Sequence, residues 1–301
     1  MGICEGRTVI VTGAARGLGR AYALAFAEAG ANVVVNDIGT SLNGEGRDTS
    51  AADAVVAEIQ AGGGRAAANY DDVADWDASR RIVEAAVKAF GGLDVVVSNA
   101  GIVRDRMFVS ATADEWDATM RVHLRGHFCL SRHAVDHWRA RQKAGEKVDA
   151  RLINTTSGAG LQGSIAQAAY STAKGGIAAL TLVQAAELGR YGITANALAP
   201  SARTRMTEQA FAEKMATQDQ AFDAMDPENI APAVVWLGSA ESAHVTGCIF
   251  ELEGGRIMIG RGWDFGPTRD KGARWTPEEI GPVVDTLLAE RAPPRKVWGT
   301  S

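Results

Sequence analysis

The sequence predicts an α/β fold: a single domain built on a doubly wound, parallel sheet of about seven strands. Short β-branched runs alternate with longer helical stretches along the chain, which is typical of a parallel sheet with crossover helices. Several of these runs are apolar on both faces, as strands covered by helices on each side must be. With right-handed crossovers, such a Rossmann-type sheet binds its ligand at the carboxyl ends of the strands.

The expected strands follow the β-branched runs in chain order, and the third has the least support because alanine is a poor strand former. The strands are Thr8–Thr12, Asn32–Asn36, Arg65–Tyr70, Leu93–Ser98, Arg151–Thr156, Thr194–Leu198 and Cys248–Leu252. Helices fill the gaps between them. The helices are Gly17–Ala29, Ala51–Ala61, Asp77–Phe90, Ala113–Lys143, Ala168–Tyr191 and Pro227–Ser239.

The chain is expected to divide at about residue 255. Residues 5–255 form the predicted domain, without an internal repeat or linker. Residues 256–301 form a C-terminal extension with a loop over Gly260–Trp275, one amphipathic helix over Thr276–Ala289 and a Pro-rich end. The extension is too short for a second domain, so we expect it to pack on the first or on a neighbouring subunit.

Composition excludes several classes of protein. The 301 residues carry 31 Lys and Arg against 36 Asp and Glu, a net charge of −5, so the basic surplus of a nucleic-acid binder is missing. Apolar residues make up 46% and charged residues 22%, as in ordinary globular domains. Glycine, with 34 residues, exceeds its usual share of about 7%, while proline has only 8. We therefore expect the glycines at tight turns and close approaches.

Targeting and metal signals are also missing. No run of about 18 uncharged apolar residues occurs, so we expect no membrane span. The opening MGICEGRTVIVTG does not resemble a signal peptide. Cys4, Cys129 and Cys248 lie far apart and in no metal spacing, so we expect free thiols, a cytoplasmic protein and no metal site.

A glycine-rich turn follows the first strand and opens a helix, with the sequence TGAARGLG over Thr12–Gly19. Gly13 permits the turn, Gly17 lets the backbone approach a pyrophosphate, and Gly19 lets the helix lie close to the sheet. The start of the helix, around Leu18, supplies free N–H groups and a partial positive charge for phosphates. The spacing is GxxxGxG rather than the commoner GxGxxG, and an ordinary turn is the alternative.

Asp37 ends the second strand, where a carboxylate hydrogen-bonds the adenine ribose of NAD and repels the extra phosphate of NADP. The alternatives are that Asp37 only caps the following loop, or that Arg16 binds a ribose phosphate and selects NADP. We favour NAD, because Asp37 is the better placed. The other predicted residues of this sheet edge end the third and fourth strands: Asp72, Val73, Asn99, Ala100 and Gly101.

Tyr170 and Lys174 stand four residues apart in a helical stretch (YSTAK), which puts the phenol and the ammonium on one face. An ammonium nearby favours the phenolate, so we expect a lowered Tyr170 pKa that suits an acid/base for hydride transfer. Ser157 follows the fifth strand and can donate a hydrogen bond to a substrate oxygen. A YxxxK alone is usually surface helix, but here it accompanies the glycine turn and Asp37.

The motifs TGAARGLG, SNAG, TTS, YSTAK and a turn at Pro200, in this order, resemble the short-chain dehydrogenase/reductase family over about residues 5–255. The resemblance implies Tyr170 as acid/base, Ser157 orienting the carbonyl, and Lys174 also holding the nicotinamide ribose. It further implies cofactor contacts from Asn99, from Pro200 and, at the adenine, from Asp72 and Val73.

Two departures from the family's usual pattern narrow the resemblance. His123 stands in VHLRGHF where the family often has an Asn whose bent backbone holds a relay water; we expect the His123 carbonyl to replace it, or the ring to pack in a helix kink. The usual PGxxxT is here PSARTRMT, from Pro200 to Thr207. With VVVND, GIVRDRMF and a tail beginning GRGW, these features resemble the (3R)-hydroxyacyl-CoA dehydrogenase branch, found in peroxisomal multifunctional enzyme type 2 and bacterial single-domain relatives.

The resemblance implies an NAD(P)-dependent oxidoreductase that interconverts a secondary alcohol and a ketone, on a 3-hydroxyacyl-CoA. A hydroxysteroid or other apolar alcohol is the alternative substrate, and a catalytically silent dinucleotide-binding protein is a third hypothesis. The family's long central helices imply a homodimer or homotetramer, with no nucleic-acid or membrane partner.

Two further features bear on the substrate. Ser201–Met225 has the apolar pattern of an amphipathic lid, carried by Met206, Phe211, Met215, Phe222 and Met225, with ordinary helix packing as the alternative. Four arginines after parallel strands could bind the phosphates of CoA, or pair with carboxylates such as Asp105 and Glu208. They are Arg104, Arg106, Arg203 and Arg205.

Overall fold

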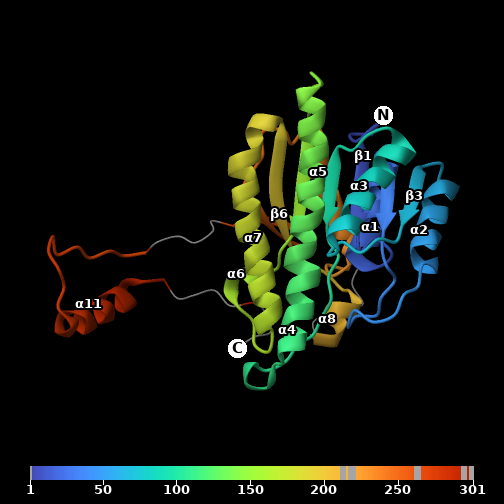
Figure 1. The fold of residues 1–301 in the computed structure, drawn as a ribbon. Helices are drawn as coiled ribbons and strands as arrows, with labels where there is room; N and C mark the ends of the chain where they lie inside the picture. Colours follow the sequence, from blue (N-terminus) through green and yellow to red (C-terminus); the bar gives the residue numbers. More distant parts are fainter. Residues whose placement is uncertain (1, 211–214, 216–221, 261–265, 293–296, 298–301) are drawn as a thin grey trace.

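An eight-stranded sheet runs through the molecule in the order β3-β2-β1-β4-β5-β6-β7-β8 (Figure 1). The computed structural model describes residues 2–210, 215, 222–260, 266–292 and 297. All neighbouring strands are parallel except β7 and β8. The strands are β1 Thr8–Thr12, β2 Asn32–Asn36, β3 Arg65–Asn69, β4 Val95–Ser98, β5 Ala150–Thr155, β6 Ile193–Ser201, β7 Ile249–Glu253 and β8 Arg256–Ile259. The predicted doubly wound α/β fold is confirmed.

Helices cover both faces of the sheet. Helices α3, α5 and α7 lie on one face, and α1, α2 and α10 pack on the other (Figure 1). The helices are α1 Gly17–Glu28, α2 Ser50–Ala61, α3 Trp76–Phe90, α4 Ala113–Met120, α5 Gly126–Lys143, α6 Gly158–Gln162, α7 Ala168–Leu188, α8 Arg205–Ala210, α10 Ala231–Gly238 and α11 Pro277–Glu290. No described helix is long and apolar enough to cross a membrane.

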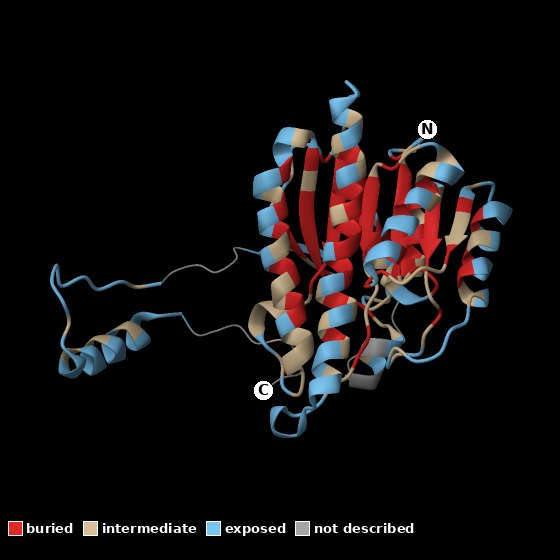
Figure 2. Cartoon of the chain, viewed as in Figure 1, coloured by how far each residue is buried: buried red, intermediate tan, exposed pale blue. Residues whose placement is uncertain are grey.

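The hydrophobic core has two halves, one on each side of the sheet, and the strands at its centre are buried throughout (Figure 2). In β1, Val9 and Val11 pack with Phe26 of α1, whereas Ile10 packs with Trp138 of α5. This alternation is what a strand with helices on both faces requires. Because these strands are parallel, the carboxyl ends of β1, β2, β4, β5 and β6 lie along one edge of the sheet, and the predicted site residues follow those ends.

The structure corrects several predicted boundaries. The expected helix Ala113–Lys143 is interrupted by one turn of π-helix at Arg121–Arg125. Pro200 lies inside β6 rather than in a turn after it, opposite Leu252 of β7. The ladder with β5 stops at Leu198, so at Pro200 the strand has lost one neighbour and tolerates a proline.

The sheet also continues further than expected. Arg256–Ile259, placed at the start of the extension and not among the predicted strands, forms the antiparallel edge strand β8, because Gly254 adopts a left-handed turn (φ 53°) that reverses the chain. The predicted tail helix is confirmed as α11, opened by a capping box between Thr276 and Glu279. It stands away from the sheet and buries none of its residues (Figures 1 and 2). Packing of this segment on a neighbouring subunit stays a prediction.

Candidate active site

The turn between β1 and α1 places backbone N–H groups at the carboxyl edge of the sheet. Gly13 and Gly17 both have positive φ, at 63° and 53°, a conformation that other residues rarely adopt. A Cβ on Gly19 would lie 2.1 Å from the Gly13 carbonyl oxygen, and one on Gly13 would lie 2.9 Å from Cα of Ala100. Close packing therefore excludes side chains here. This cradle fits the pyrophosphate of a dinucleotide, which Gly13, Gly17 and the start of α1 would hold.

A hydrogen-bond cluster locks the ends of β1 and β4 together beneath this turn. The Thr12 hydroxyl accepts from the N–H groups of Asn99 (2.9 Å) and Ala100 (3.0 Å), and the Asn99 amide donates back to the Thr12 carbonyl at 3.1 Å. Sequence reasoning found Asn99 and Ala100 but missed Thr12. Its only signal was a hydroxyl residue at the last position of an otherwise apolar strand.

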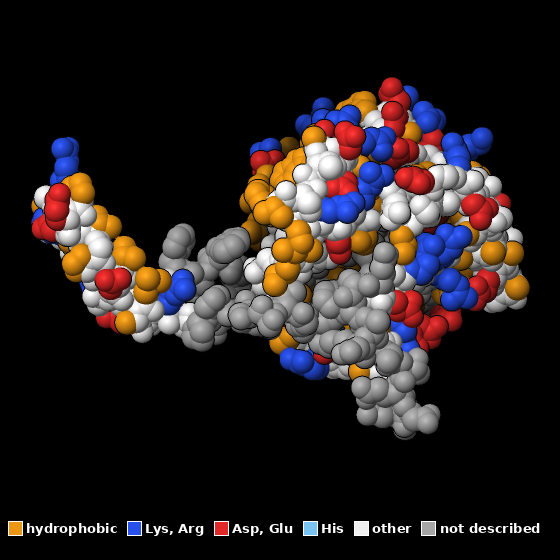
Figure 3. Space-filling view, turned by 90° about the horizontal axis from the view of Figure 1, so that it is seen from below, with side chains coloured by type: hydrophobic (Ala, Val, Ile, Leu, Met, Phe, Trp, Pro, Cys, Tyr) orange, Lys and Arg blue, Asp and Glu red, His pale blue; other side chains and the backbone are white. Residues whose placement is uncertain are grey.

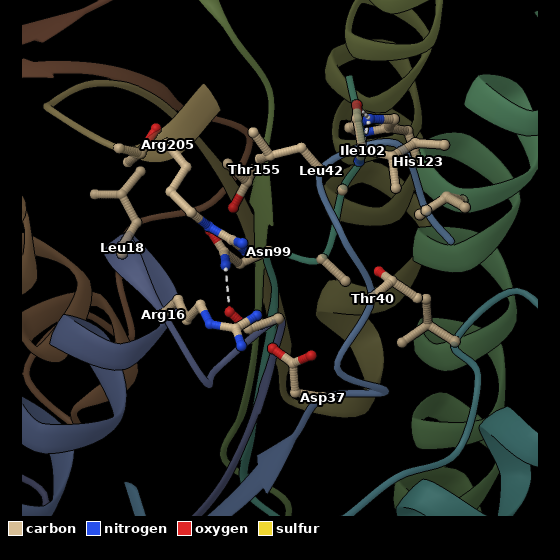
Figure 4. Close-up of a pocket in the computed structure, with 18 of the residues that line it drawn as sticks. Arg16, Leu18, Asp37, Thr40, Leu42, Asn99, Ile102, His123, Thr155 and Arg205 are labelled. Atoms are coloured by element: carbon tan, nitrogen blue, oxygen red, sulfur yellow. Dashed lines mark hydrogen bonds between the residues drawn. The ribbon is translucent and has the colours of Figure 1, made fainter. Parts of the chain in front are cut away.

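Asp37 lines a cavity at the carboxyl edge of the sheet, and its carboxylate also accepts hydrogen bonds from the neighbouring loops (Figure 4). One carboxylate oxygen accepts from the Ala15 N–H at 3.0 Å, and the other accepts from the Gly39 N–H at 2.7 Å. The loop-capping role considered as an alternative is therefore present. Arg16 also extends into the pocket, with its guanidinium 3.9 Å from Asp48.

Asp72 and Val73, the residues predicted to contact the adenine, line the same cavity as the glycine turn. Asp72 accepts from the Ala74 N–H at 2.8 Å and forms an ion pair with Arg121 at 2.6 Å. Val73 is buried against Gly126, whose Cβ would lie 2.9 Å from it. All of the predicted site residues except Gly19 line one cavity of about 310 Å³; Gly19 lies behind it, under Gly13.

Ser157, Tyr170 and Lys174 line the same cavity. Ser157 follows β5 and caps α6, accepting from the Ala159 N–H at 3.2 Å. Tyr170 and Lys174 project from one face of α7, with Nζ 5.6 Å from the centre of the phenol ring. Nζ donates to the Thr155 carbonyl at 2.7 Å, which fixes the lysine at the end of β5.

The expectation of a lowered tyrosine pKa is wrong for this structure. Burial raises the pKa of Tyr170 to about 12, although a hydrogen bond with Ser157 opposes the shift. Burial also lowers the pKa of Lys174 to about 7. The burial that places Lys174 near the phenol thus also disfavours the charged form of its ammonium group. The site holds Tyr170 protonated, ready to donate to a carbonyl.

His123 lies in the π-helical turn and is packed, as the alternative interpretation had it. Its Nε2 lies 2.8 Å from the carbonyl oxygen of Ile102, and its ring stands edge-on to Tyr170 at 5.3 Å. Burial drives the pKa of His123 well below its ordinary value, so the ring is neutral. The His123 carbonyl accepts from Nδ1 of His127 at 2.7 Å, which satisfies a group that the π-turn leaves free.

The predicted lid is described only in part. The predicted segment starts at Ser201, the last residue of β6, and helix α8 follows from Arg205. Met215 is 2% exposed and Phe222 is 55% exposed, while Phe211 and the side chain of Met206 lie outside the described residues. The side chains of the four arginines have different surroundings. Arg106 pairs with Glu115 and Arg203 with Asp223, rather than with Asp105 and Glu208. Arg104 donates to the Asn43 carbonyl at 2.9 Å, and Arg205 extends into the pocket (Figure 4).

Comparisons with known proteins give matches over most of the chain. A family model described as short chain dehydrogenase matches residues 7–215. The chain is 46% identical over 259 residues to the mouse protein "Peroxisomal multifunctional enzyme type 2", a match that covers 86% of this chain and 32% of that protein. The chain therefore spans about a third of the length of that relative.

Two further matches extend over nearly the whole chain. The "Hydroxyacyl-CoA dehydrogenase ChsB1" of Mycobacterium tuberculosis is 39% identical over 303 residues, covering 98% of this chain and 93% of that protein. A solved structure of a short chain dehydrogenase from Mycobacterium avium is 58% identical, with a TM-score of 0.89, and the match covers 99% of this chain and 100% of that one.

Proposed function

Because the chain belongs to the short chain dehydrogenase family and is an oxidoreductase of secondary alcohols and ketones, we propose that it interconverts a 3-hydroxyacyl-CoA and the 3-oxoacyl-CoA. The observation that carries the proposal is the single cavity lined both by the glycine turn and by Ser157, Tyr170 and Lys174. The names of relatives, which include hydroxyacyl-CoA dehydrogenase, support the acyl-CoA class.

The residues divide the work according to their chemistry. A bound nicotinamide supplies hydride transfer at the reacting carbon. Ser157 donates a hydrogen bond to the substrate oxygen, and Tyr170 takes up the hydroxyl proton in oxidation or gives a proton to the carbonyl in reduction. Lys174, held at the Thr155 carbonyl, binds the nicotinamide ribose and supports the charge on Tyr170. Asp37 and the glycine turn hold the adenosine end, with NAD as the preferred cofactor.

Cations for the CoA phosphates come from two of the four arginines. Arg104 and Arg205 have no carboxylate partner in the described part of the chain, whereas Arg106 and Arg203 do. Basic and acidic side chains are interspersed on the face seen from below (Figure 3), so binding would depend on individual arginines rather than on a broad basic patch. This interspersion also favours a small-molecule partner over nucleic acid.

We also propose a homo-oligomer in the cytoplasm. Helices α5 and α7 expose Phe128, Leu182 and Val183, each 45% exposed or more, on faces suited to pairing with a second copy. Some relatives carry the word peroxisomal in their names, so a peroxisomal location is the competing possibility.

The deciding experiment compares three substrates under one set of conditions: a 3-hydroxyacyl-CoA, the free 3-hydroxy acid and a hydroxysteroid. We expect the CoA ester to have the highest kcat/KM, and Arg104→Ala and Arg205→Ala to lower kcat/KM for the ester selectively. Arg80→Ala, an exposed arginine of α3, is the control and should change nothing. A steroid preferred over the ester, with no selective arginine effect, would replace the acyl-CoA substrate with an apolar alcohol. Cofactor binding without turnover on any of the three would favour a silent binding protein.

A further inference from the structure

A half-buried carboxylate that the mechanism does not use lies beside the loop leading to α7. Asp105, on the loop after β4, accepts a hydrogen bond from the Gln167 amide at 2.8 Å through one oxygen. Its other oxygen is buried and has no hydrogen-bond partner among the described residues. Such a half-satisfied carboxylate costs stability, so its presence calls for a function.

The arginines on either side leave this charge without a counter-ion. The side chain of Arg104 donates to the Asn43 carbonyl, and that of Arg106 forms its ion pair with Glu115 on α4. Burial raises the pKa of Asp105, while the Gln167 hydrogen bond favours its charged form. Among the described residues, no cation is paired with Asp105.

The two loops are joined at this point in a strained conformation. The Arg106 N–H donates to the Ala166 carbonyl at 2.7 Å, and Arg106 forms an isolated bridge with Gln167. Ala166 has a φ of 61°, the one positive φ outside glycine among the described residues. Strain of this kind persists only where surrounding contacts enforce it, and it is common near active sites. Gln167 caps α7, and Tyr170 lies in the first turn of that helix.

We propose that Asp105 is a positioning residue for Tyr170, which it restrains through Gln167 and whose proton it helps to retain. The inference rests on the proposed role of Tyr170 as the acid/base. A negative charge near the phenol opposes the phenolate, and Asp105 raises the pKa of Tyr170 in this way. The other groups facing the phenol are Ser157, which favours the phenolate, the neutral His123, and Lys174. Asp105 thus raises the pH at which the phenol ionises.

The test separates the charge of Asp105 from its hydrogen bond. Asp105→Asn keeps an acceptor for Gln167 and removes the charge, so the apparent pKa in the pH profile of kcat/KM for alcohol oxidation should fall by roughly one unit. Gln167→Ala keeps the charge and removes the hydrogen bond, so it should reduce kcat without lowering that pKa. Asp114→Asn, which removes an exposed charge from α4, is the matched control and should leave the profile unchanged.

The outcomes distinguish this inference from the proposed function. An unchanged pH profile in Asp105→Asn, with thermal unfolding and NADH binding as in the unmodified protein, overturns the role of Asp105. If Tyr170→Phe keeps full turnover, the acid/base assignment itself fails. If Asp105→Asn does not fold, Asp105→Ser supplies the second measurement: it also removes the charge, so a lower apparent pKa supports the inference and an unchanged pKa overturns it.

Discussion

At Tyr170 the environment matters more than the sequence spacing. The four-residue step to Lys174 does bring the two groups to one face of α7, as the helical period requires. Lys174 is nevertheless buried and Tyr170 half-buried, and desolvation shifts the pKa of each group so that its neutral form is favoured. The sequence identified the pair but not the direction of the tyrosine shift, because desolvation depends on what the rest of the chain packs around it.

The first residue-scale prediction concerns this phenol. Tyr170→Phe removes one oxygen and leaves the ring against His123, so the fold and NADH binding should persist. Turnover should fall at least about 100-fold, the usual loss for an acid/base. Steady-state kinetics beside a fluorescence titration with NADH measures both. Turnover close to that of the unmodified enzyme would contradict the assignment.

The second residue-scale prediction concerns the choice between NAD and NADP at Asp37. Asp37→Ala removes the charge that repels a 2′-phosphate and leaves Arg16 in the pocket, so the ratio of kcat/KM for NAD to that for NADP should fall. Asp37→Asn is the control for structure, since an amide oxygen can still accept from the loop N–H groups of Ala15 or Gly39. If the unmodified enzyme already prefers NADP, Arg16 decides the choice and the interpretation of Asp37 is wrong.

At the scale of elements, one π-helical turn reorganises the region that the sequence predicted as a single helix. The turn at Arg121–Arg125 directs His123 toward Ile102 and the Tyr170 ring, and it leaves the His123 carbonyl for His127. This packing requires a glycine at position 101, because a Cβ on Gly101 would lie 2.4 Å from Cε1 of His123. Helical periodicity cannot reveal such a bulge, since one inserted residue hardly alters the apolar pattern.

A second buried histidine, His127, makes the free energy of unfolding depend on pH. Burial lowers the pKa of His127 to about 3, whereas the unfolded chain has the ordinary value of about 6.5. Above pH 6.5 neither state binds the proton, so the stabilisation is complete. Below it only the unfolded state does, and the free energy of unfolding falls by about 1.4 kcal/mol per pH unit until the folded pKa is reached.

His127→Gln should therefore flatten the decline in stability between pH 6 and 5 by about 1 kcal/mol, measured by urea unfolding at the two values. The slope, rather than the absolute stability, is compared, because the variant also loses the hydrogen bond to the His123 carbonyl. His244→Gln, at an exposed histidine, is the control and should keep the slope of the unmodified protein. Equal slopes in all three proteins would show that His127 titrates normally.

At the scale of the whole molecule, a buried arginine ties the sheet to α10 at the edge opposite the active site. Arg151 of β5 is 1% exposed, and its Nε donates to the Ser239 carbonyl at 3.1 Å and lies 3.2 Å from the Ser242 hydroxyl. Asp149 pairs with it at 2.7 Å and with Arg7 at 2.9 Å. The network joins the start of β5, the segment before β1 and the end of α10, so it stabilises the domain far from the chemistry.

Arg151→Met should lower the free energy of unfolding by about 2 kcal/mol, because it removes one of the two cations that pair with Asp149 and a charged donor to the buried Ser239 carbonyl. Arg80→Ala breaks exposed ion pairs with Asp77 and Glu84 and should change stability by less than about 1 kcal/mol. Kinetic constants should stay unchanged in both variants. A loss below about 1 kcal/mol in Arg151→Met would mean that the network does not contribute as described.

The sequence by itself determined the alternating strands and helices, the glycine turn and the chemistry-bearing residues Asp37, Ser157, Tyr170 and Lys174. These depend on local properties: β-branched runs, the freedom of glycine, and helical spacing. Only the tertiary structure decided how these groups behave. Thr12 locks two strand ends, His123 turns inward at a π-bulge, β8 adds an antiparallel edge, and Asp105 reaches Gln167. Each of these depends on contacts between residues distant in sequence, and on the burial that such contacts create, neither of which a local pattern contains.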